Sequence, residues 1–292
     1  MNRALEQSIP QIPEEKKSGL RVIIHSFFVV PLLIAFFALI IFLVLRLLTA
    51  EPSTARDYLN DVKIGGNTRR WQGAFELSKI LSDPQKVPND DRFVQDMINT
   101  FEHAQHDRDE RIKYYLALAM GRTEDSRYVS TLARGLEDKD PNTVASCVYA
   151  LGLIKDTVLL DKMDLLKNHN NAQVRLQLVI ALGYLGNDSA IPILLEKLQD
   201  EEENVVWDAA VALAKLGNSS GRKILINLLD RNYFTSFPNI DEEEQAAAIL
   251  VAIRTSVFIQ NPELKKSLEV LKNGDKNFKI QEAARIALEQ FN

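Results

Sequence analysis

One long apolar run lies near the N-terminal end of the sequence. Between Val22 and Leu45, 19 of 24 residues are Leu, Ile, Val or Phe, and no Asp, Glu, Lys or Arg interrupts them. At about 1.5 Å per residue, a helix of this length spans roughly 36 Å, more than the ~30 Å hydrocarbon core of a bilayer. Residues 22–45 are therefore predicted to form a single transmembrane helix.

A cleaved signal peptide is the alternative interpretation of this run. Lys16, Lys17 and Arg21 precede it, and Ser53 and Ala55 fit a small-x-small cleavage pattern. The apolar core of a signal peptide has roughly 7–15 residues, however, and this run is much longer. We therefore expect an uncleaved anchor.

The charges that flank the apolar run predict its orientation by a narrow margin. Four basic side chains precede it and three follow within about 20 residues, namely Arg3, Lys16, Lys17 and Arg21 against Arg46, Arg56 and Lys63. Because cytoplasmic flanks are enriched in Lys and Arg, we expect a cytoplasmic N-terminus in a bacterial inner membrane and the rest of the chain on the periplasmic or external side; the opposite orientation stays open. Residues 1–20, with two prolines, are expected to form a disordered tail.

Residues 68–292 repeat a helical pattern. The clearest copies are AQVRLQLVIALGYLGN (Ala172–Asn187) and ENVVWDAAVALAKLGN (Glu203–Asn218), offset by 31 residues. With Ala181 as the reference position, an apolar residue lies three positions earlier in every copy, which is helical spacing. The seven reference positions are Ser78, Ala119, Ala150, Ala181, Ala212, Ala252 and Ala287.

Each copy continues into a turn and a second segment with helical periodicity. Alanine in a buried stripe lets a neighbouring helix approach closely, as stacked helical hairpins require. The pattern thus predicts an all-α solenoid over residues 68–292, with six hairpins and a terminal helix at 280–291. Residues 46–67 are expected to form a juxtamembrane linker with a short helix at 54–63.

These copies resemble the HEAT repeat in its short bacterial form, which also occurs in phycobilin lyases. The pattern V-R-x-x-A-x-x-A-L-G is matched by Val174, Arg175, Ala181, Leu182 and Gly183, and next best by Val205, Ala209, Ala212 and Leu213. The first and sixth copies depart from it, since Trp71 and Gln245 replace the leading valine and Ile80 and Arg254 replace the glycine. The resemblance implies an α-solenoid with protein-binding surfaces, and it does not imply lyase activity.

Charge excludes one class of partner. The first 50 residues hold five basic and three acidic side chains, so residues 51–292 carry a net charge of −7. Binding to a nucleic-acid backbone requires clustered positive charge. We therefore expect no nucleic-acid partner.

No catalytic, cofactor or metal motif stands out, because G-x-S-x-G, H-E-x-x-H and a phosphate loop are all missing from the sequence. The single cysteine, Cys147, lies in the apolar stripe of its helix and is expected to be a small buried residue. His103 and His106 could share a helix face as metal ligands, but a solvated helix end explains them better. We therefore expect no enzyme, no cofactor and no metal.

Candidate partner-binding residues come from an aromatic insertion and from two acidic runs. The insertion at 231–241 places Tyr233, Phe234 and Phe237 outside any helical stripe, either as a partner contact or as a local plug between helices. The acidic runs Asp200–Glu203 and Asp241–Glu244 precede first helices, where acidic side chains suit the helix dipole. An acidic rim that steers a basic partner is the other interpretation, and it assigns Glu201, Glu202, Glu242 and Glu243 to partner binding.

We expect a membrane-anchored scaffold for protein–protein interactions, such as an accessory subunit of a transporter or of an envelope assembly complex. The anchor would confine the solenoid to one membrane face and raise its effective concentration there. A solenoid enzyme or lyase-like protein is one alternative. A structural protein that self-associates through its transmembrane helix is another, for which Ala35 and Ala38 form a small-residue patch.

Overall fold

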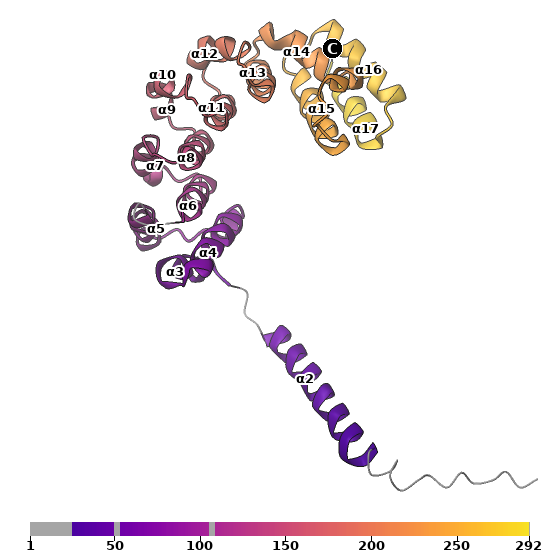
Figure 1. Cartoon of the computed structure of the whole chain (residues 1–292). Coiled ribbons are helices and arrows are strands. Elements are labelled where there is room, and N and C mark those ends of the chain that lie inside the picture. Colours follow the sequence, from indigo (N-terminus) through magenta and orange to yellow (C-terminus); the bar gives the residue numbers. More distant parts are fainter. Residues whose placement is uncertain (1–24, 50–52, 105–108, 292) are drawn as a thin grey trace, which may run out of the picture. The chain divides into compact units, whose positions relative to one another are not determined.

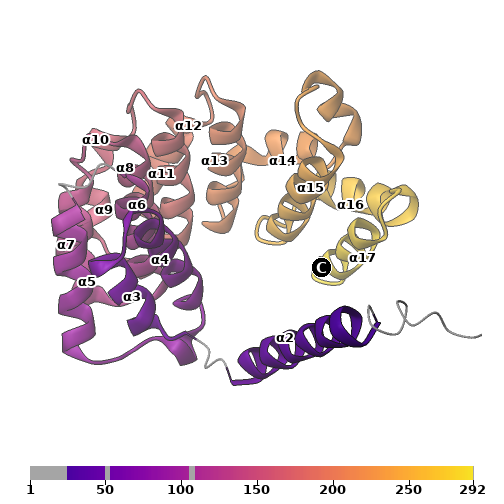
Figure 2. The same ribbon diagram turned by 60° about the horizontal axis from the view of Figure 1, so that its bottom comes forward.

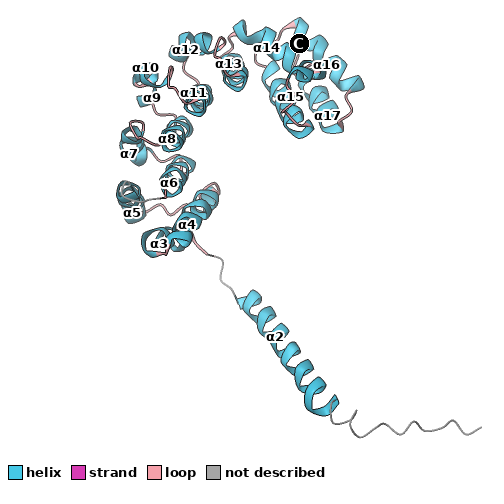
Figure 3. Ribbon diagram, in the orientation of Figure 1, coloured by secondary structure: helices cyan, strands magenta, loops and turns pink. Residues whose placement is uncertain are grey.

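The computed structural model describes residues 25–49, 53–104 and 109–291. It divides into two compact units, Met1–Ser53 and Thr54–Asn292. The described residues form helices, turns and loops without strands (Figure 3). The predicted tail at 1–20 lies outside the described residues.

The first unit contains one long helix. A π-helical turn, η1 (His25–Val29), leads into α2 (Val30–Thr49). The segment Phe27–Leu45 is long and apolar enough to cross a membrane, and its large apolar side chains are exposed to solvent. A signal sequence near an N-terminus meets the same criteria.

The second unit is a solenoid with two rows of helices. Helices of the inner row lie side by side along the concave face, and helices of the outer row cover them (Figures 1 and 2). The inner row consists of α4 (Asn67–Ile80), α6 (Arg111–Arg122), α8 (Pro141–Ile154), α11 (Ala172–Leu185), α13 (Glu203–Lys215), α15 (Glu242–Ser256) and α17 (Phe278–Leu288). The outer row consists of α5 (Asp91–His103), α7 (Val129–Gly135), α9 (Val158–Asp161), α10 (Met163–Leu166), α12 (Ile191–Lys197), α14 (Arg222–Leu228) and α16 (Pro262–Gly274).

The reference positions of the sequence repeat form the centre of this stack. All seven lie in inner-row helices and are at most 4% exposed. Gly121 lies against Ala150 and Gly152 against Ala181, so closely that a Cβ on either glycine would come within 2.6 Å of the alanine Cβ. The same contact between Gly183 and Ala212 is looser, at 3.1 Å. Glycine two residues after the reference alanine therefore sets the close spacing of α6, α8, α11 and α13.

The folded unit begins earlier than the repeat pattern predicted. Helix α3 (Ala55–Ile64) falls in the expected linker, but Ala55, Leu59 and Val62 are buried in the solenoid core. Their i, i+4, i+7 spacing gives the helix an apolar face that packs on α4. Thr54 caps α3 in a reciprocal capping box with Asp57.

Buried side chains of the solenoid form two clusters that meet in α13. Val205, Ala209, Ala212 and Leu213 belong to the cluster that extends back to α3. Trp207, Ala210, Val211 and Ala214 belong to the cluster that extends forward to α17. A single helix thus joins two hydrophobic cores.

The arginine of the repeat motif has a structural role. Arg175 is buried, and its guanidinium donates to both carboxylate oxygens of Asp200 at 2.9–3.2 Å and to the carbonyl of His169 at 2.8 Å. Burial alone would raise the pKa of Asp200, but hydrogen bonds from Arg175 and Lys197 outweigh burial and lower it. Asp200 therefore holds the end of α12 against the start of α11.

Candidate interaction groove on the inner row

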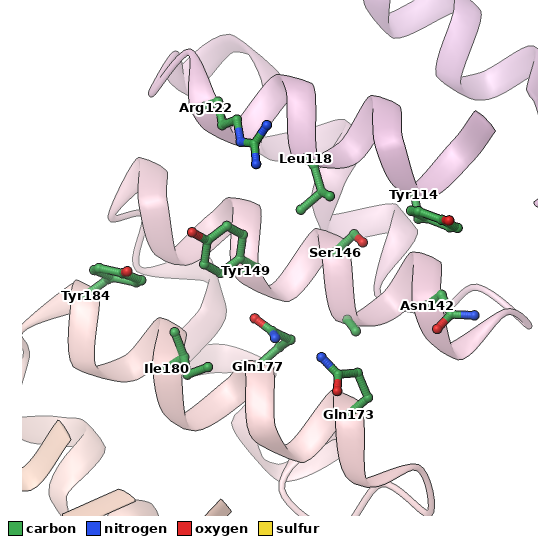
Figure 4. Close-up of a pocket in the computed structure, with 11 residues that line it drawn as sticks. Tyr114, Leu118, Arg122, Asn142, Ser146, Tyr149, Gln173, Gln177, Ile180 and Tyr184 are labelled. Carbon is green, nitrogen blue, oxygen red and sulfur yellow. The ribbon is translucent and has the colours of Figure 1, made fainter. Parts of the chain in front are cut away.

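A groove of about 730 Å³ crosses the inner faces of α6, α8 and α11 (Figure 4). Most of its lining side chains lie outside the buried stripe, and the repeat places them at fixed intervals. The lining residues are Tyr114, Leu118, Arg122, Asn142, Ala145, Ser146, Tyr149, Gln173, Gln177, Ile180 and Tyr184.

Polar side chains form a short ladder across the groove. Asn142 and Gln173 both lie eight residues before a reference alanine, and Ser146 and Gln177 both lie four residues before it. The amides of Gln173 and Gln177 point from α11 toward α8 (Figure 4). Neither makes a side-chain hydrogen bond to any residue in the described ranges, so their donors and acceptors are available to a ligand.

Tyrosine rings form the apolar surfaces of the same groove. The ring centroids of Tyr149 and Tyr184 are 6.1 Å apart with the planes at 73°, and the Lys215 ammonium lies 5.1 Å from the Tyr184 centroid. Tyr114 packs against Tyr115 on α6, with centroids 4.4 Å apart. Rigid tyrosines beside amides suit the recognition of a peptide, because they supply contact area with little loss of side-chain freedom.

Burial sets the charge states around the groove. It raises the pKa of Tyr114 to about 12 and also raises the pKa of Tyr184, which moves both hydroxyls further from ionisation than an exposed tyrosine. Asp208 on α13 continues the ladder of Ser146 and Gln177, and burial raises the pKa of its carboxyl to about 6 against the opposing effect of Lys215. Arg122 occupies the α6 side, where its guanidinium donates to the carbonyl of Ser78.

The aromatic insertion folds onto the solenoid. It forms the 3₁₀ helix η7 (Arg231–Ser236), in which Phe234 is only 2% exposed. The Trp207 ring contacts Tyr233, Phe234 and Phe237 at centroid distances of 5.4–6.2 Å, and the Trp207 Nε1–H donates to the Tyr233 hydroxyl at 3.2 Å. This placement supports the local-plug interpretation for Phe234, while Tyr233 and Phe237 stay half-buried.

The acidic runs divide into structural and exposed members. Asp241 and Glu244 form a capping box at the start of α15. Exposed Glu201 accepts from Arg175 at 2.9 Å, and exposed Glu242 pairs with Lys276 at 2.7 Å. The described structure gives Glu202 and Glu243 no ion pair, so these two keep the exposed charge that an acidic rim requires.

The remaining candidates contribute no reactive centre. Cys147 is buried as predicted, and burial raises the pKa of its thiol. The His103 Nδ1 contacts the Asn99 carbonyl at 2.6 Å, whereas His106 lies outside the described residues. Among described residues, no three His, Cys, Asp or Glu side chains are grouped to hold a metal ion.

Sequence reasoning missed the groove. The buried stripe and the insertions do not point to it, because its polar positions lie outside both. The recurrence of Asn142 and Gln173 at one position, and of Ser146, Gln177 and Asp208 at another, was the signal that could have located it.

Comparisons with known proteins agree with this architecture. A HEAT-repeat family model matches residues 159–234, from α9 into η7. A search of curated proteins found no match. Among solved structures, the complex of CpcE and CpcF of phycocyanin lyase from a Nostoc species has a TM-score of 0.55, with 16% identity over 84% of this chain and 97% of that chain.

Two further similar structures have lower TM-scores. YibA of Escherichia coli has a TM-score of 0.49, with 16% identity over 80% of this chain and 81% of its own. A designed armadillo repeat protein has a TM-score of 0.37, with 17% identity over 82% of this chain and 100% of its own. The described part of the chain is all-helical, and its residues 159–234 match the HEAT-repeat family model.

Proposed function

We propose that this protein is a membrane-anchored scaffold that binds a segment of a partner protein in the groove across α6, α8 and α11. The observation that carries the proposal is the set of uncommitted amides and tyrosine faces in that groove. A peptide backbone presents the N–H and C=O groups that such amides bind. We propose no enzymatic activity, because the groove brings together no nucleophile and base.

The anchor is the second part of the proposal. A cut after Ala55, the cleavage pattern in the sequence, would remove Ala55 from the core and Thr54 from the capping box of α3. Loss of an N-cap costs about 1 kcal/mol, and a buried methyl group would be lost as well. These costs favour an uncleaved helix at 22–45 that keeps the solenoid at a membrane.

The likeness to the CpcE–CpcF complex supports binding between chains and carries no activity. That structure is itself a complex of two proteins. At 16% identity the likeness concerns the fold alone. We propose partners within a membrane-associated complex, such as a transporter or an envelope assembly.

The test is comparative purification from native membranes in mild detergent, with quantitative mass spectrometry of the co-purified proteins. We expect Gln173→Ala combined with Gln177→Ala to lower the yield of one stoichiometric partner at least about tenfold, since a loss of 1.4 kcal/mol is tenfold in affinity. The matched control is Gln199→Ala with Asn227→Ala, which removes two exposed amides outside the groove. Identical partner yields from the wild-type protein, the groove variant and the control variant would contradict the proposal.

A further inference from the structure

A second groove opens at the C-terminal end of the inner row, between α15 and α17. It has a volume of about 750 Å³, and eight of its twelve lining side chains are apolar. Phe278 is 82% exposed, Phe258 55% and Ile286 45%. Large apolar side chains gathered in an exposed groove mark an interaction site, whereas scattered ones do not.

The repeat register changes at the groove. Two residues after the reference position, α6, α8 and α11 carry a glycine that lies against the next helix. Arg254 occupies this position in α15. Its side chain does not fit a contact that excludes even a methyl group, so α15 and α17 do not form that glycine–alanine contact. Arg254 lies in the wall of the groove between these two helices.

The charges of the groove define what fits it. Arg254 on α15 and Lys279 on α17 line the groove, and neither forms an ion pair with any residue that the structure describes. The only acidic side chain in the lining, Glu282, is held by Arg285 through two hydrogen bonds of 2.7 and 2.9 Å. An apolar floor thus lies between two uncompensated cations on opposite walls.

We propose that the α15–α17 groove is a docking site for an apolar protein segment flanked by acidic residues. Apolar side chains of the segment fill the floor, and its carboxylates pair with Arg254 and Lys279. A protein segment fits better than a bilayer surface, because the site is concave and peripheral binding to anionic lipid uses clusters of four to eight basic residues. The proposal goes beyond the scaffold function and does not depend on the α6–α11 groove.

The test uses the full chain in zwitterionic nanodiscs and an array of synthetic peptides. The array varies a core of four apolar residues and flanks it with Asp and Glu, with Asn and Gln, or with Lys. We expect acid-flanked peptides to be retained at least tenfold more than lysine-flanked ones, with a preference that weakens as salt rises. No difference between the flanks would overturn the proposal.

Two variants locate the binding. Arg254→Glu with Lys279→Glu should reverse the preference toward lysine-flanked peptides, and Phe278→Ser, at an exposed position, should lower retention at least tenfold. The matched control, Lys266→Glu with Lys272→Glu, makes the same charge change on exposed residues of α16 and should leave the preference unchanged. Retention that no groove variant alters would overturn the proposal.

Two further controls separate this site from a lipid site and from the first groove. The first control measures the binding of phosphatidylglycerol vesicles to the chain in zwitterionic nanodiscs. If the chain binds these vesicles, shows no preference among the peptides, and loses vesicle binding on charge reversal, the site binds lipid and the proposal is wrong. Gln173→Ala with Gln177→Ala should not alter peptide retention in the C-terminal groove. A loss in that variant would assign the peptides to the α6–α11 groove and contradict the proposal.

Discussion

Single glycine–alanine contacts determine the spacing of the inner-row helices. A Cβ on Gly152 would lie 2.5 Å from the Ala181 Cβ and 2.6 Å from its Cα, and a backbone atom cannot give way as a flexible side chain does. We expect Gly152→Ala to cost about 1–3 kcal/mol, the usual cost of overpacking. Chemical denaturation of the purified protein, followed by circular dichroism, measures the change.

Gly274 at the end of α16 is the control for that substitution. No atom lies within 4 Å of where its Cβ would be. Gly274→Ala should therefore be neutral or stabilise by up to ~1 kcal/mol through the unfolded chain. Equal unfolding midpoints for Gly152→Ala and Gly274→Ala would show that the close contact does not limit stability.

Asp208 should give the protein an unusual pH dependence. Burial raises the pKa of its carboxyl from 3.8 to about 6, so the folded chain holds a proton that the unfolded chain releases between these values. Stability from this group is therefore present below pH 4 and is lost as the pH rises through 6. We expect Asp208→Asn to raise the free energy of unfolding by about 1–3 kcal/mol at pH 7, measured as a higher unfolding midpoint. At pH 4 the midpoint should be unchanged.

The comparison for Asp208 is Asp164→Asn, which removes an exposed carboxylate paired with Lys167. Its effect on the unfolding midpoint should be small at both pH values, because exposed ion pairs contribute little. A midpoint for Asp208→Asn that is equally displaced at pH 4 and pH 7 would mean that the substitution acts through packing rather than through titration.

At the scale of elements, the η7 insertion is a structural plug. Phe234 is buried against Trp207, so Phe234→Ala is expected to cost ~3–5 kcal/mol. Half-buried Phe237 provides the comparison, and Phe237→Ala should cost clearly less. Thermal unfolding of both variants measures this difference. If Phe234→Ala leaves the unfolding temperature almost unchanged, the plug interpretation is wrong and the insertion is better explained as a partner contact.

The sequence predicted elements where a stripe recurs and failed where a choice depends on tertiary contacts. The alanine register indicated the inner-row helices because small residues at helical spacing have one physical use, close packing. For Phe234, partner contact and plug require the same composition, and only the position of Trp207 distinguishes them. Helix α3 carries no copy of the repeat, so its burial by α4 was not visible in the pattern.

At the scale of the whole molecule, the boundary between the two units can be tested directly. A chain of residues 54–292 keeps the Thr54 capping box and the buried face of α3. We expect it to be soluble and helical, and we expect the full chain to stay in the membrane pellet after alkaline carbonate extraction. If expression of the full-length sequence instead yields a soluble protein whose first residue lies near position 56, the signal-peptide interpretation is established.

The meeting of two cores in α13 has a mechanical consequence. Each repeat touches only its neighbours, so a load applied between the two ends of the solenoid passes through every interface in series. Elements in series extend most where they are softest. The glycine–alanine contacts that hold α6, α8, α11 and α13 close together are not repeated between the inner-row helices α13 and α15 or between α15 and α17. We expect tension to extend the C-terminal part of the solenoid most. The α6–α11 groove would then keep its shape, and with it its affinity for a bound segment.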